Sequence, residues 1–346
     1  MVCCLSNTFL RTGDHPFRGR DVRTTASRRY CRKDPGVATP GTETQLNMQT
    51  TRITLRAPAK INLSLHILGK REDGYHELET LMQKISLYDE LELGLVAEPG
   101  VRIHCSTPEI PTDERNIAVR AAQLFLSETG NSDQGINIVL KKNIPIAAGL
   151  GGGSSDAAAV LNGLDQLLQT ACSTEQRAEM GVRLGADVPL FVYDFPAALA
   201  TGKGERLLPA PSLTDYRILL VNPGIPVSTQ WAYEAFSSAA AKIALTANKK
   251  AFILSCSKKS GKFAIPDDLK NDLEQVTAKR YPVIRELKDH LLRSGAAGAM
   301  MSGSGSTVFG LFHRKVAEKA EQCRYRLEQE YDQVCLVSPL TDYEAR

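Results

Sequence analysis

The residues best suited to chemistry lie between Pro145 and Ala159, which read P-I-A-A-G-L-G-G-G-S-S-D-A-A-A. Four glycines within five positions allow positive φ angles and let a ligand approach the backbone closely. Ser154, Ser155 and Asp156 follow where a helix is expected to begin. A helix N-terminus carries unpaired N–H groups and a partial positive charge, so the run predicts a phosphate-binding loop. The sequence leaves open which of the two serines would contact a metal ion.

A tight strand-to-helix connection with an ordinary serine or aspartate cap is the simpler interpretation of the same run. Four glycines and two serines exceed what a cap requires, which favours phosphate binding. The spacing also excludes two common glycine loops. No lysine follows the glycines, as the Walker A pattern G-x-x-x-x-G-K-[ST] demands, and the dinucleotide pattern G-x-G-x-x-G is not completed.

Two charged residues elsewhere stand where they could act on a substrate. Lys60 lies in the alternating run A-P-A-K-I-N-L-S-L, on the same polar face as Asn62, so it is either a solvated strand residue or part of a cleft. Asp187 falls between a helix end and an apolar run, which suits a turn residue or a general base at a pocket rim. Tyr75 and His76 follow a turn, and on local evidence alone they are packing residues.

Length and composition limit the possible classes of protein. The chain has 346 residues, 42% of them hydrophobic, with a mean hydropathy of −0.20, which predicts a globular protein of two domains. Eight cysteines without a C-x-x-C pair indicate reduced thiols rather than disulfides or zinc. The net charge is +3, but residues 1–48 alone carry about +4, and a near-neutral remainder gives no reason to expect nucleic-acid binding. No apolar run is long enough to span a membrane.

Residues 1–48 have no sustained apolar periodicity and are rich in Arg, Thr, Ser, Gly and Pro, so we expect a disordered extension. Three explanations compete: an organelle transit peptide, a solvated extension, or upstream sequence that precedes a true start at Met48. The third is favoured, because the domain pattern begins within a few residues of Met48. A plastid address is the second choice.

Hydrophobic periodicity predicts the elements that would position the candidate site. In the first half we expect strands at 53–57, 61–67, 87–96 and 136–141, and helices at 116–128, 154–168 and 174–184. Pro209–Pro211 marks the expected boundary between domains 50–210 and 211–346. The second half is expected to contain a strand at 217–221, a loop at 222–233, a helix and loop at 239–262, helices at 268–279, 283–294 and 315–331, and strands at 308–312 and 333–337. This order predicts an α+β sandwich.

The glycine run resembles the phosphate loop of the GHMP kinases. Other blocks are similar to the same family and cover nearly everything from Ala57 to Phe312: A-P-A-K-I-N-L, R-E-D-G-Y-H-E-L-E-T-L, L-G-A-D-V-P-L-F, G-K-G-E and S-G-S-G-S-T. D-G-Y-H is the most diagnostic block. It resembles the branch of the family that acts on 4-diphosphocytidyl-2-C-methyl-D-erythritol.

The resemblance implies an α+β, two-domain GHMP kinase fold, with a ribosomal-protein-S5-like N-terminal domain and a ferredoxin-like C-terminal domain. It implies ATP-dependent phosphorylation of the 2-hydroxyl of that cytidine-linked methylerythritol, in the non-mevalonate route to isoprenoid precursors. ATP and Mg²⁺ are the implied cofactors, and the small-molecule substrate is the implied partner. We expect a monomer or weak homodimer in the bacterial cytoplasm, without a nucleic-acid or membrane partner.

The resemblance also implies roles for single residues. Asp187 would be the catalytic base and Lys60 its partner. The nucleotide would contact Pro145, Ala147, Ala148, Gly149, Leu150, Gly151, Gly152, Gly153, Ser154, Ser155, Lys142 and Asn116. The substrate would contact Asn62, Tyr75, His76, Thr229 and Tyr233. Within the second set, His76 would bind the cytosine ring, Tyr75 would pack on the cytidine, and Thr229 and Tyr233 would close the pocket from the second domain.

One segment departs from the family pattern. After G-A-D-V-P-L-F the family has a small or glycine pair, whereas this chain has Tyr193-Asp194-Phe195-Pro196. Two other functions stay open. A GHMP kinase for homoserine or a mevalonate derivative would leave the Tyr-His pair and Tyr233 without a shared purpose. A non-catalytic ligand-binding relative would have no use for Lys60 together with Asp187.

Overall fold

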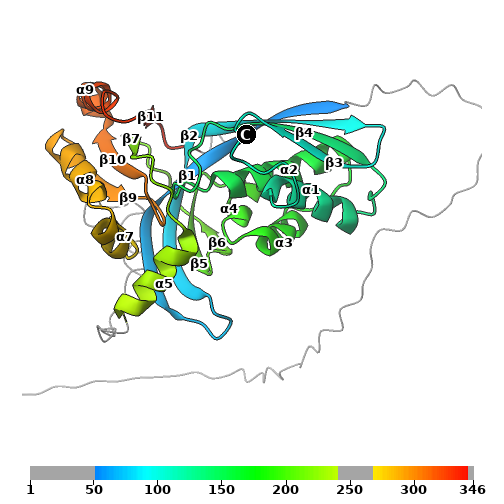
Figure 1. Cartoon of the computed structure of the whole chain (residues 1–346), viewed down its shortest axis with the longest axis horizontal. Helices are drawn as coiled ribbons and strands as arrows, with labels where there is room; N and C mark the ends of the chain where they lie inside the picture. Colours follow the sequence, from blue (N-terminus) through cyan, green and yellow to red (C-terminus); the bar gives the residue numbers. More distant parts are fainter. Residues whose placement is uncertain (1–50, 241–267, 342–346) are drawn as a thin grey trace, which may run out of the picture. The chain divides into compact units, whose positions relative to one another are not determined.

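The computed structural model describes residues 51–240 and 268–341, which all belong to one compact unit spanning residues 46–346 (Figure 1). The expected extension at residues 1–48 lies outside the described residues, and so does almost all of the helix and loop expected at 239–262. Within the described residues the strands form a seven-stranded sheet and a four-stranded sheet. None of the described helices is long and apolar enough to cross a membrane.

A long antiparallel hairpin of β1 (Arg52–Lys70) and β2 (His76–Val96) runs through the first sheet. The prediction of two separate strands around Pro58 is wrong, because β1 continues through the proline. The pairing with β2 shifts register between Pro58 and Ala59 and again between Asn62 and Ser64. Proline has no N–H to give to the ladder, and a bulge accommodates it without ending the strand.

The first sheet has the order β3-β4-β2-β1-β8, and β5 pairs with both β2 and β6. The additional strands are β3 (Gly100–Cys105), β4 (Gly135–Lys141), β5 (Ala197–Gly202), β6 (Arg206–Pro209) and β8 (Lys270–Asn271). The strand expected at 136–141 is confirmed as β4. The sequence analysis did not predict β5, which reads A-A-L-A-T-G and has few of the branched or aromatic residues typical of strands.

Helices cover one face of this sheet (Figure 1). They are α1 (Ile117–Glu128), α2 (Gly152–Leu168), α3 (Thr174–Leu184) and α4 (Val188–Val192). The predicted helices at 116–128 and 174–184 are confirmed, and α2 begins two residues before the expected Ser154. Side chains from helices and strands form a common core, in which Phe125 of α1, Leu164 of α2 and Ile138 of β4 are fully buried.

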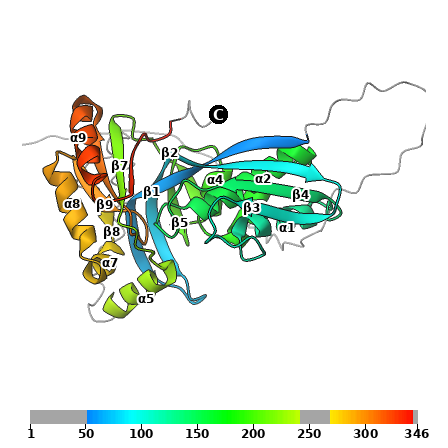
Figure 2. The ribbon, with the colours of Figure 1, turned by 45° about the horizontal axis from the view of Figure 1, so that its top comes forward.

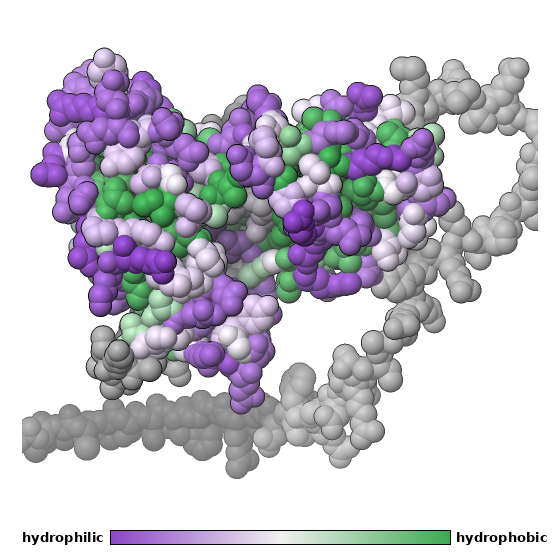
Figure 3. All heavy atoms as spheres, in the orientation of Figure 1, coloured by the Kyte–Doolittle hydropathy of each residue, from purple (hydrophilic) through white to green (hydrophobic). Residues whose placement is uncertain are grey.

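The second sheet is antiparallel and has the order β11-β7-β10-β9. Its strands are β7 (Tyr216–Asn222), β9 (Gly298–Met301), β10 (Val308–His313) and β11 (Gln333–Val337). One face packs against α7 (Glu274–Arg280), α8 (Val283–Arg293) and α9 (Ala317–Leu327), which Figure 2 shows on the side away from the first sheet. The opposite face packs on β1, where Phe309 and Leu220 meet Ile61 and Leu63. The outer surface of α9 is hydrophilic (Figure 3).

Three expectations for the second half are wrong. The expected loop at 222–233 ends early, because α5 (Thr229–Ala240) begins at Thr229. The helix expected at 268–279 begins only at Glu274, since Lys270 and Asn271 instead extend the first sheet beside β1. The helix expected at 315–331 starts as a 3₁₀ turn, Arg314–Val316, and ends at Leu327.

Candidate active site

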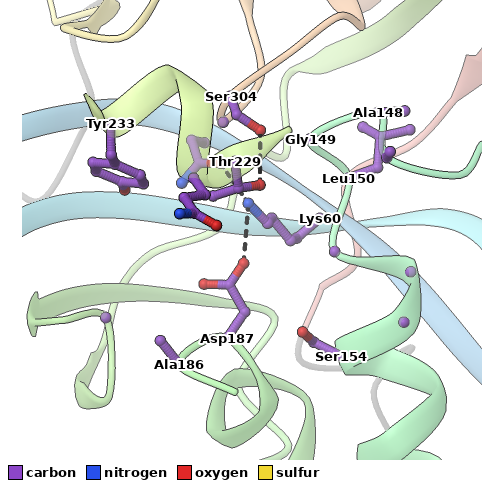
Figure 4. Close-up of a pocket in the computed structure, with 18 of the residues that line it drawn as sticks. Lys60, Ala148, Gly149, Leu150, Ser154, Ala186, Asp187, Thr229, Tyr233 and Ser304 are labelled. Carbon is purple, nitrogen blue, oxygen red and sulfur yellow. Dashed lines mark hydrogen bonds and ion pairs between the residues drawn. The ribbon is translucent and has the colours of Figure 1, made fainter. Parts of the chain in front are cut away.

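A cleft of about 1130 Å³ lies between the glycine run, the β1–β2 hairpin and α5. Its walls come from both halves of the sequence, with Lys60 and Asp187 from the first and Thr229, Tyr233 and Ser304 from the second (Figure 4). His76 of the first half also lines it. All residues that the sequence analysis assigned to nucleotide, substrate or catalysis line this cleft, except Ser155. Ser155 is buried, and its hydroxyl oxygen has no hydrogen-bond partner among the described residues.

The glycine run leads directly into the N-terminus of α2. Gly151 is the N-cap residue with φ 73° and ψ 15°, and no side chain within the described part of the chain caps this helix end. Gly149 also has a positive φ, of 77°. A Cβ at Gly149 would lie 2.0 Å from the Ser302 carbonyl oxygen, so only glycine fits there. The first N–H groups of α2 therefore open into the cleft without a competing side chain, as an anion site requires.

The second half of the chain holds the glycine run in place. The carbonyl oxygens of Ala147 and Ala148 accept backbone hydrogen bonds from Val227 and Thr307, at 3.3 and 3.4 Å. The hydroxyl of Ser302 donates to the Gly149 carbonyl at 2.9 Å. The S-G-S-G-S-T block thus supports the loop from behind, and Ser302 and Thr307 at its two ends supply donors.

Lys60 and Asp187 form an ion pair across the cleft, with 3.4 Å between Nζ and Oδ2 (Figure 4). The lysine side chain is 5% exposed, whereas that of Asp187 is 35% exposed. The backbone N–H of Lys60 donates to the Leu150 carbonyl at 2.9 Å, which ties β1 to the glycine run. Asp187 is the N-cap residue of α4, but its side chain accepts no capping hydrogen bond from the described residues and points at Lys60.

Asn62 orients the lysine. Its Oδ1 accepts a hydrogen bond of 2.6 Å from Lys60 Nζ, and its Nδ2 donates to Thr80 Oγ1 at 2.8 Å. The backbone N–H of Asn62 donates to Ser302 Oγ at 3.3 Å. Each side-chain polar atom of Asn62 thus makes one hydrogen bond within the protein and keeps capacity for a second, and the residue lines the cleft.

An aromatic group closes the other end of the cleft. His76 and Tyr233 stack with ring centroids 5.1 Å apart, and His76 Nε2 lies 2.7 Å from Ser237 Oγ. Burial, with a smaller effect of Lys70, lowers the pKa of His76, which favours the neutral form of the ring. Tyr75 is 58% exposed, with Lys203 Nζ 4.4 Å from its ring centroid. An aromatic, hydrogen-bonding surface of this kind suits a planar base.

Thr229 lies at the start of α5, where its hydroxyl is 3.1 Å from Ser304 Oγ (Figure 4).

Asn116 caps α1: its Oδ1 accepts from the Ala118 N–H at 2.9 Å and its Nδ2 donates to the Pro111 carbonyl. Its side chain is therefore committed to the helix end, although it borders the cleft. All the predicted residues except Ser155 thus line one cleft, but their side chains differ in how free they are to contact a ligand.

Several residues of the site were missed by the sequence analysis. Lys203 lies in the G-K-G-E block and Ser304 in the S-G-S-G-S-T block, but neither block predicts a role for that residue, and Ser237 carries no local signal. Asp156 also lines the cleft, and Asp89 lies behind it; no local pattern predicts that both contact Lys142. Lys142 Nζ donates to both of these buried carboxylates, at 2.7 Å in the case of Asp156.

The segment that departs from the family pattern, Tyr193 to Pro196, is well anchored. Buried Lys84 donates through Nζ to the Tyr193 carbonyl at 2.6 Å and through its backbone N–H to the Pro196 carbonyl at 2.8 Å. The rings of Tyr193 and Phe195 stack 4.8 Å apart. The unusual residues do not line the cleft, and Tyr193 and Phe195 pack against the core of the first sheet and its helices instead.

The site fits ATP and Mg²⁺ in different ways. The glycine run offers a cradle that only glycine allows and an open helix end, which suits a polyphosphate. Among residues 51–240 and 268–341 no group of three or more His, Cys, Asp or Glu side chains could hold a metal ion. A magnesium ion would therefore be held mainly by the phosphates, as is usual for this ion, and Ser154 offers a hydroxyl that lines the cleft in the first turn of α2.

Comparison with known proteins agrees with this geometry. Residues 116–195 match the family description "GHMP kinases N terminal domain", and residues 260–332 match "GHMP kinases C terminal". The described part of the chain therefore carries both domains of a GHMP kinase. A homoserine kinase from Cytophaga hutchinsonii shares this fold, with a TM-score of 0.63 at 20% identity over 86% of this chain and 97% of that one.

Relatives with higher sequence identity show to which branch of the GHMP kinases the chain belongs. A protein from Desulfotalea psychrophila named 4-diphosphocytidyl-2-C-methyl-D-erythritol kinase is 48% identical over 80% of this chain and 91% of its own length. One of the same name from Syntrophotalea carbinolica is 48% identical over 74% and 88%. A crystal structure of 4-(cytidine 5'-diphospho)-2C-methyl-D-erythritol kinase has a TM-score of 0.62 at 32% identity, over 83% of this chain and all of the other. The chain belongs to the family of 4-diphosphocytidyl-2-C-methyl-D-erythritol kinases.

Proposed function

We propose that the protein transfers the γ-phosphoryl group of ATP to the 2-hydroxyl of 4-diphosphocytidyl-2-C-methyl-D-erythritol, a step of the non-mevalonate route to isoprenoid precursors. The observation that carries the proposal is the place of the Lys60–Asp187 pair. It lies in one cleft between an open phosphate loop and the aromatic group of His76 and Tyr233. A nucleotide on one side and a cytidine on the other would meet at this pair.

Asp187 is the general base in this proposal. Its carboxylate is the partly exposed member of the pair and is free of capping bonds, so it can accept the proton of the substrate hydroxyl. Lys60 is held by Asn62 and lies beside the oxygen that attacks. There its ammonium orients the hydroxyl and offsets the negative charge that develops.

The glycine run binds the phosphates of ATP through the open N–H groups of α2, and Ser154 faces them from the first turn. Phosphoryl transfer needs mainly positioning and charge stabilisation, which these groups supply. Bound Mg²⁺ would neutralise the phosphate oxygens in the usual way for this reaction. Ser155, being buried away from the cleft, is less suited than Ser154 to meet either ligand.

The cytidine is bound at the aromatic end. Tyr75 and Tyr233 offer ring faces, and neutral His76 offers one ring nitrogen while Ser237 holds the other. Thr229 and Ser304 line the same cleft from the second half of the chain.

We further propose that the chain divides into domains at residues 50–210 and 211–346. We also propose that the protein acts in the bacterial cytoplasm, in keeping with the bacterial sources of its relatives.

The test is an ADP-release assay with ATP and Mg²⁺ in which three acceptors are compared: 4-diphosphocytidyl-2-C-methyl-D-erythritol, homoserine and mevalonate. We expect turnover with the cytidine compound alone. Turnover with homoserine or mevalonate instead would keep the kinase chemistry and overturn the proposed substrate. ADP release with none of the three would favour a ligand-binding protein that has lost catalysis.

A further inference from the structure

Asp89 stands where β4 leaves the first sheet, and the reaction mechanism above does not use it. The pairing of β2 with β4 runs from Val96 and Gly135 to Glu90 and Lys141. Asp89 is the next residue of β2, and its side chain is fully buried. A buried carboxylate is unfavourable unless several donors satisfy it, so its partners show what it does.

The backbone hydrogen bonds between β2 and β4 end at Glu90 and Lys141, and beyond that point the Asp89 carboxylate accepts the hydrogen bonds of the departing chain. Its Oδ1 accepts the backbone N–H groups of Asn143 and Ile144, at 2.6 and 2.8 Å. Its Oδ2 accepts a hydrogen bond from Lys142 Nζ. Asp89 therefore fixes three consecutive residues at the point where the chain turns towards the glycine run.

Lys142 joins this carboxylate to the other end of the same loop. Its ammonium also donates to Asp156 Oδ2 at 2.7 Å, and Asp156 belongs to α2, just after the glycine run. Burial alone would lower the pKa of Lys142, but the two carboxylates raise it on balance. The ammonium has three N–H donors, of which two are used, so the third is available at the cleft.

The residues fixed by Asp89 pack on the first residue of α2. A Cβ at Gly152 would lie 3.0 Å from Ile144 Cγ2 and 3.2 Å from Lys142 Nζ. The N–H groups of this first turn are those that the phosphate loop offers to an anion. Movement of Lys142 or Ile144 would therefore displace the groups that meet the nucleotide.

We infer that Asp89 is a positioning residue for nucleotide binding, which acts by holding Lys142 and Ile144 against the start of α2. This inference rests on the proposed use of the glycine run for ATP, but not on the identity of the second substrate. The chain offers a matched control one residue further along. Glu90 and Lys141 form the adjacent ion pair, at 3.3 Å, with both side chains about half exposed.

The experiment measures the dissociation constant of ATP with Mg²⁺ by calorimetry, without the second substrate, for Asp89→Asn, Lys142→Met and the double variant. We expect Asp89→Asn to weaken binding roughly tenfold or more, and the double variant to be no weaker than Lys142→Met, because both changes break one interaction. Glu90→Gln and Lys141→Met should leave the constant within about twofold. Binding of the cytidine substrate should be unchanged in every variant, a split that general unfolding would not produce.

An ATP dissociation constant for Asp89→Asn within twofold of that of the unaltered protein would overturn the inference, and so would strictly additive effects in the double variant. If Asp89→Asn does not fold, Ile144→Ala takes its place. That variant removes the contact with Gly152 while the ion pairs remain, so unchanged ATP affinity would equally overturn the inference. Failure of the proposed kinase reaction would appear separately, as ATP binding without turnover.

Discussion

The aliphatic stem of Lys60 fills the space in which a side chain at Gly151 would lie. A Cβ at Gly151 would be 3.0 Å from Lys60 Cγ and 3.1 Å from Cε. Gly151 is also the N-cap residue of α2, with φ 73°. The lysine that reaches Asp187 and the loop proposed to hold ATP are thus in direct contact, so a change in one must alter the other.

Gly151→Ala is expected to lower kcat by roughly tenfold or more. The added methyl group would push Lys60 away from Asp187 and would strain a positive φ. The measurement is kcat with saturating substrates, together with thermal unfolding. Gly130→Ala is the matched control, since Gly130 has φ 70° but open space around its Cβ position. Equal kcat in the two variants would show that the contact with Lys60 is unimportant.

Tyr233→Leu is expected to raise the KM for the cytidine substrate and to leave the KM for ATP unchanged. Stacking of a base on an aromatic ring contributes about 1–3 kcal/mol, or roughly 5- to 150-fold in affinity. Tyr325→Leu serves as the control, because Tyr325 is 67% exposed on α9 and does not line the cleft. If the KM for ATP rose by the same factor, Tyr233 would not be specific for the cytidine substrate, and the proposed role would be contradicted.

Lys84 is expected to make stability depend on pH. Burial lowers its pKa in the folded protein to about 8 from 10.5, with Asp194 opposing the shift. Between these two values the unfolded chain holds a proton that the folded protein has released. The free energy of unfolding should therefore rise with pH across this window, by on the order of 3 kcal/mol at most. Below pH 8 this contribution is constant.

Denaturant unfolding at pH 7.5, 8.5 and 9.5 measures this dependence. Lys84→Met should be less stable throughout, because the Tyr193 carbonyl loses its donor, and the part of the pH slope due to Lys84 should disappear. The same slope in both proteins would mean that Lys84 keeps its proton when folded.

The sequence predicted most of the first-half helices correctly, and also that the glycine run leads into a helix, because these features depend on local periodicity and on residue types. The helix at 174–184 carries its own signals: Ser173 and Gln176 form a capping box, and Gly185 follows the last turn. The start of α5 had a similar signal that was overlooked. Ser228 Oγ accepts the Trp231 N–H at 3.3 Å, but the prolines and glycine before it favoured a loop.

The residues named from the family blocks, except Ser155, line one cleft, yet the blocks did not reveal what each side chain contacts. Periodicity assigns a residue to a face and says nothing of its partner across the fold. The hydrogen bond between His76 and Ser237 joins residues far apart in the chain, and the three donors to Asp89 reach it only once β4 turns away from β2. Pairings of this kind require the tertiary structure.

The central claim is that Asp187 accepts the proton of the substrate hydroxyl with Lys60 beside it, and Asp187→Asn tests it most directly. The variant should fold, bind ATP and the cytidine substrate with near-normal dissociation constants, and lose on the order of a hundredfold to ten-thousandfold in kcat. Asp194→Asn, which changes an exposed carboxylate close by in sequence, should retain full turnover. Near-normal kcat in Asp187→Asn would contradict the account, because the pair at the centre of the cleft would then not perform the chemistry.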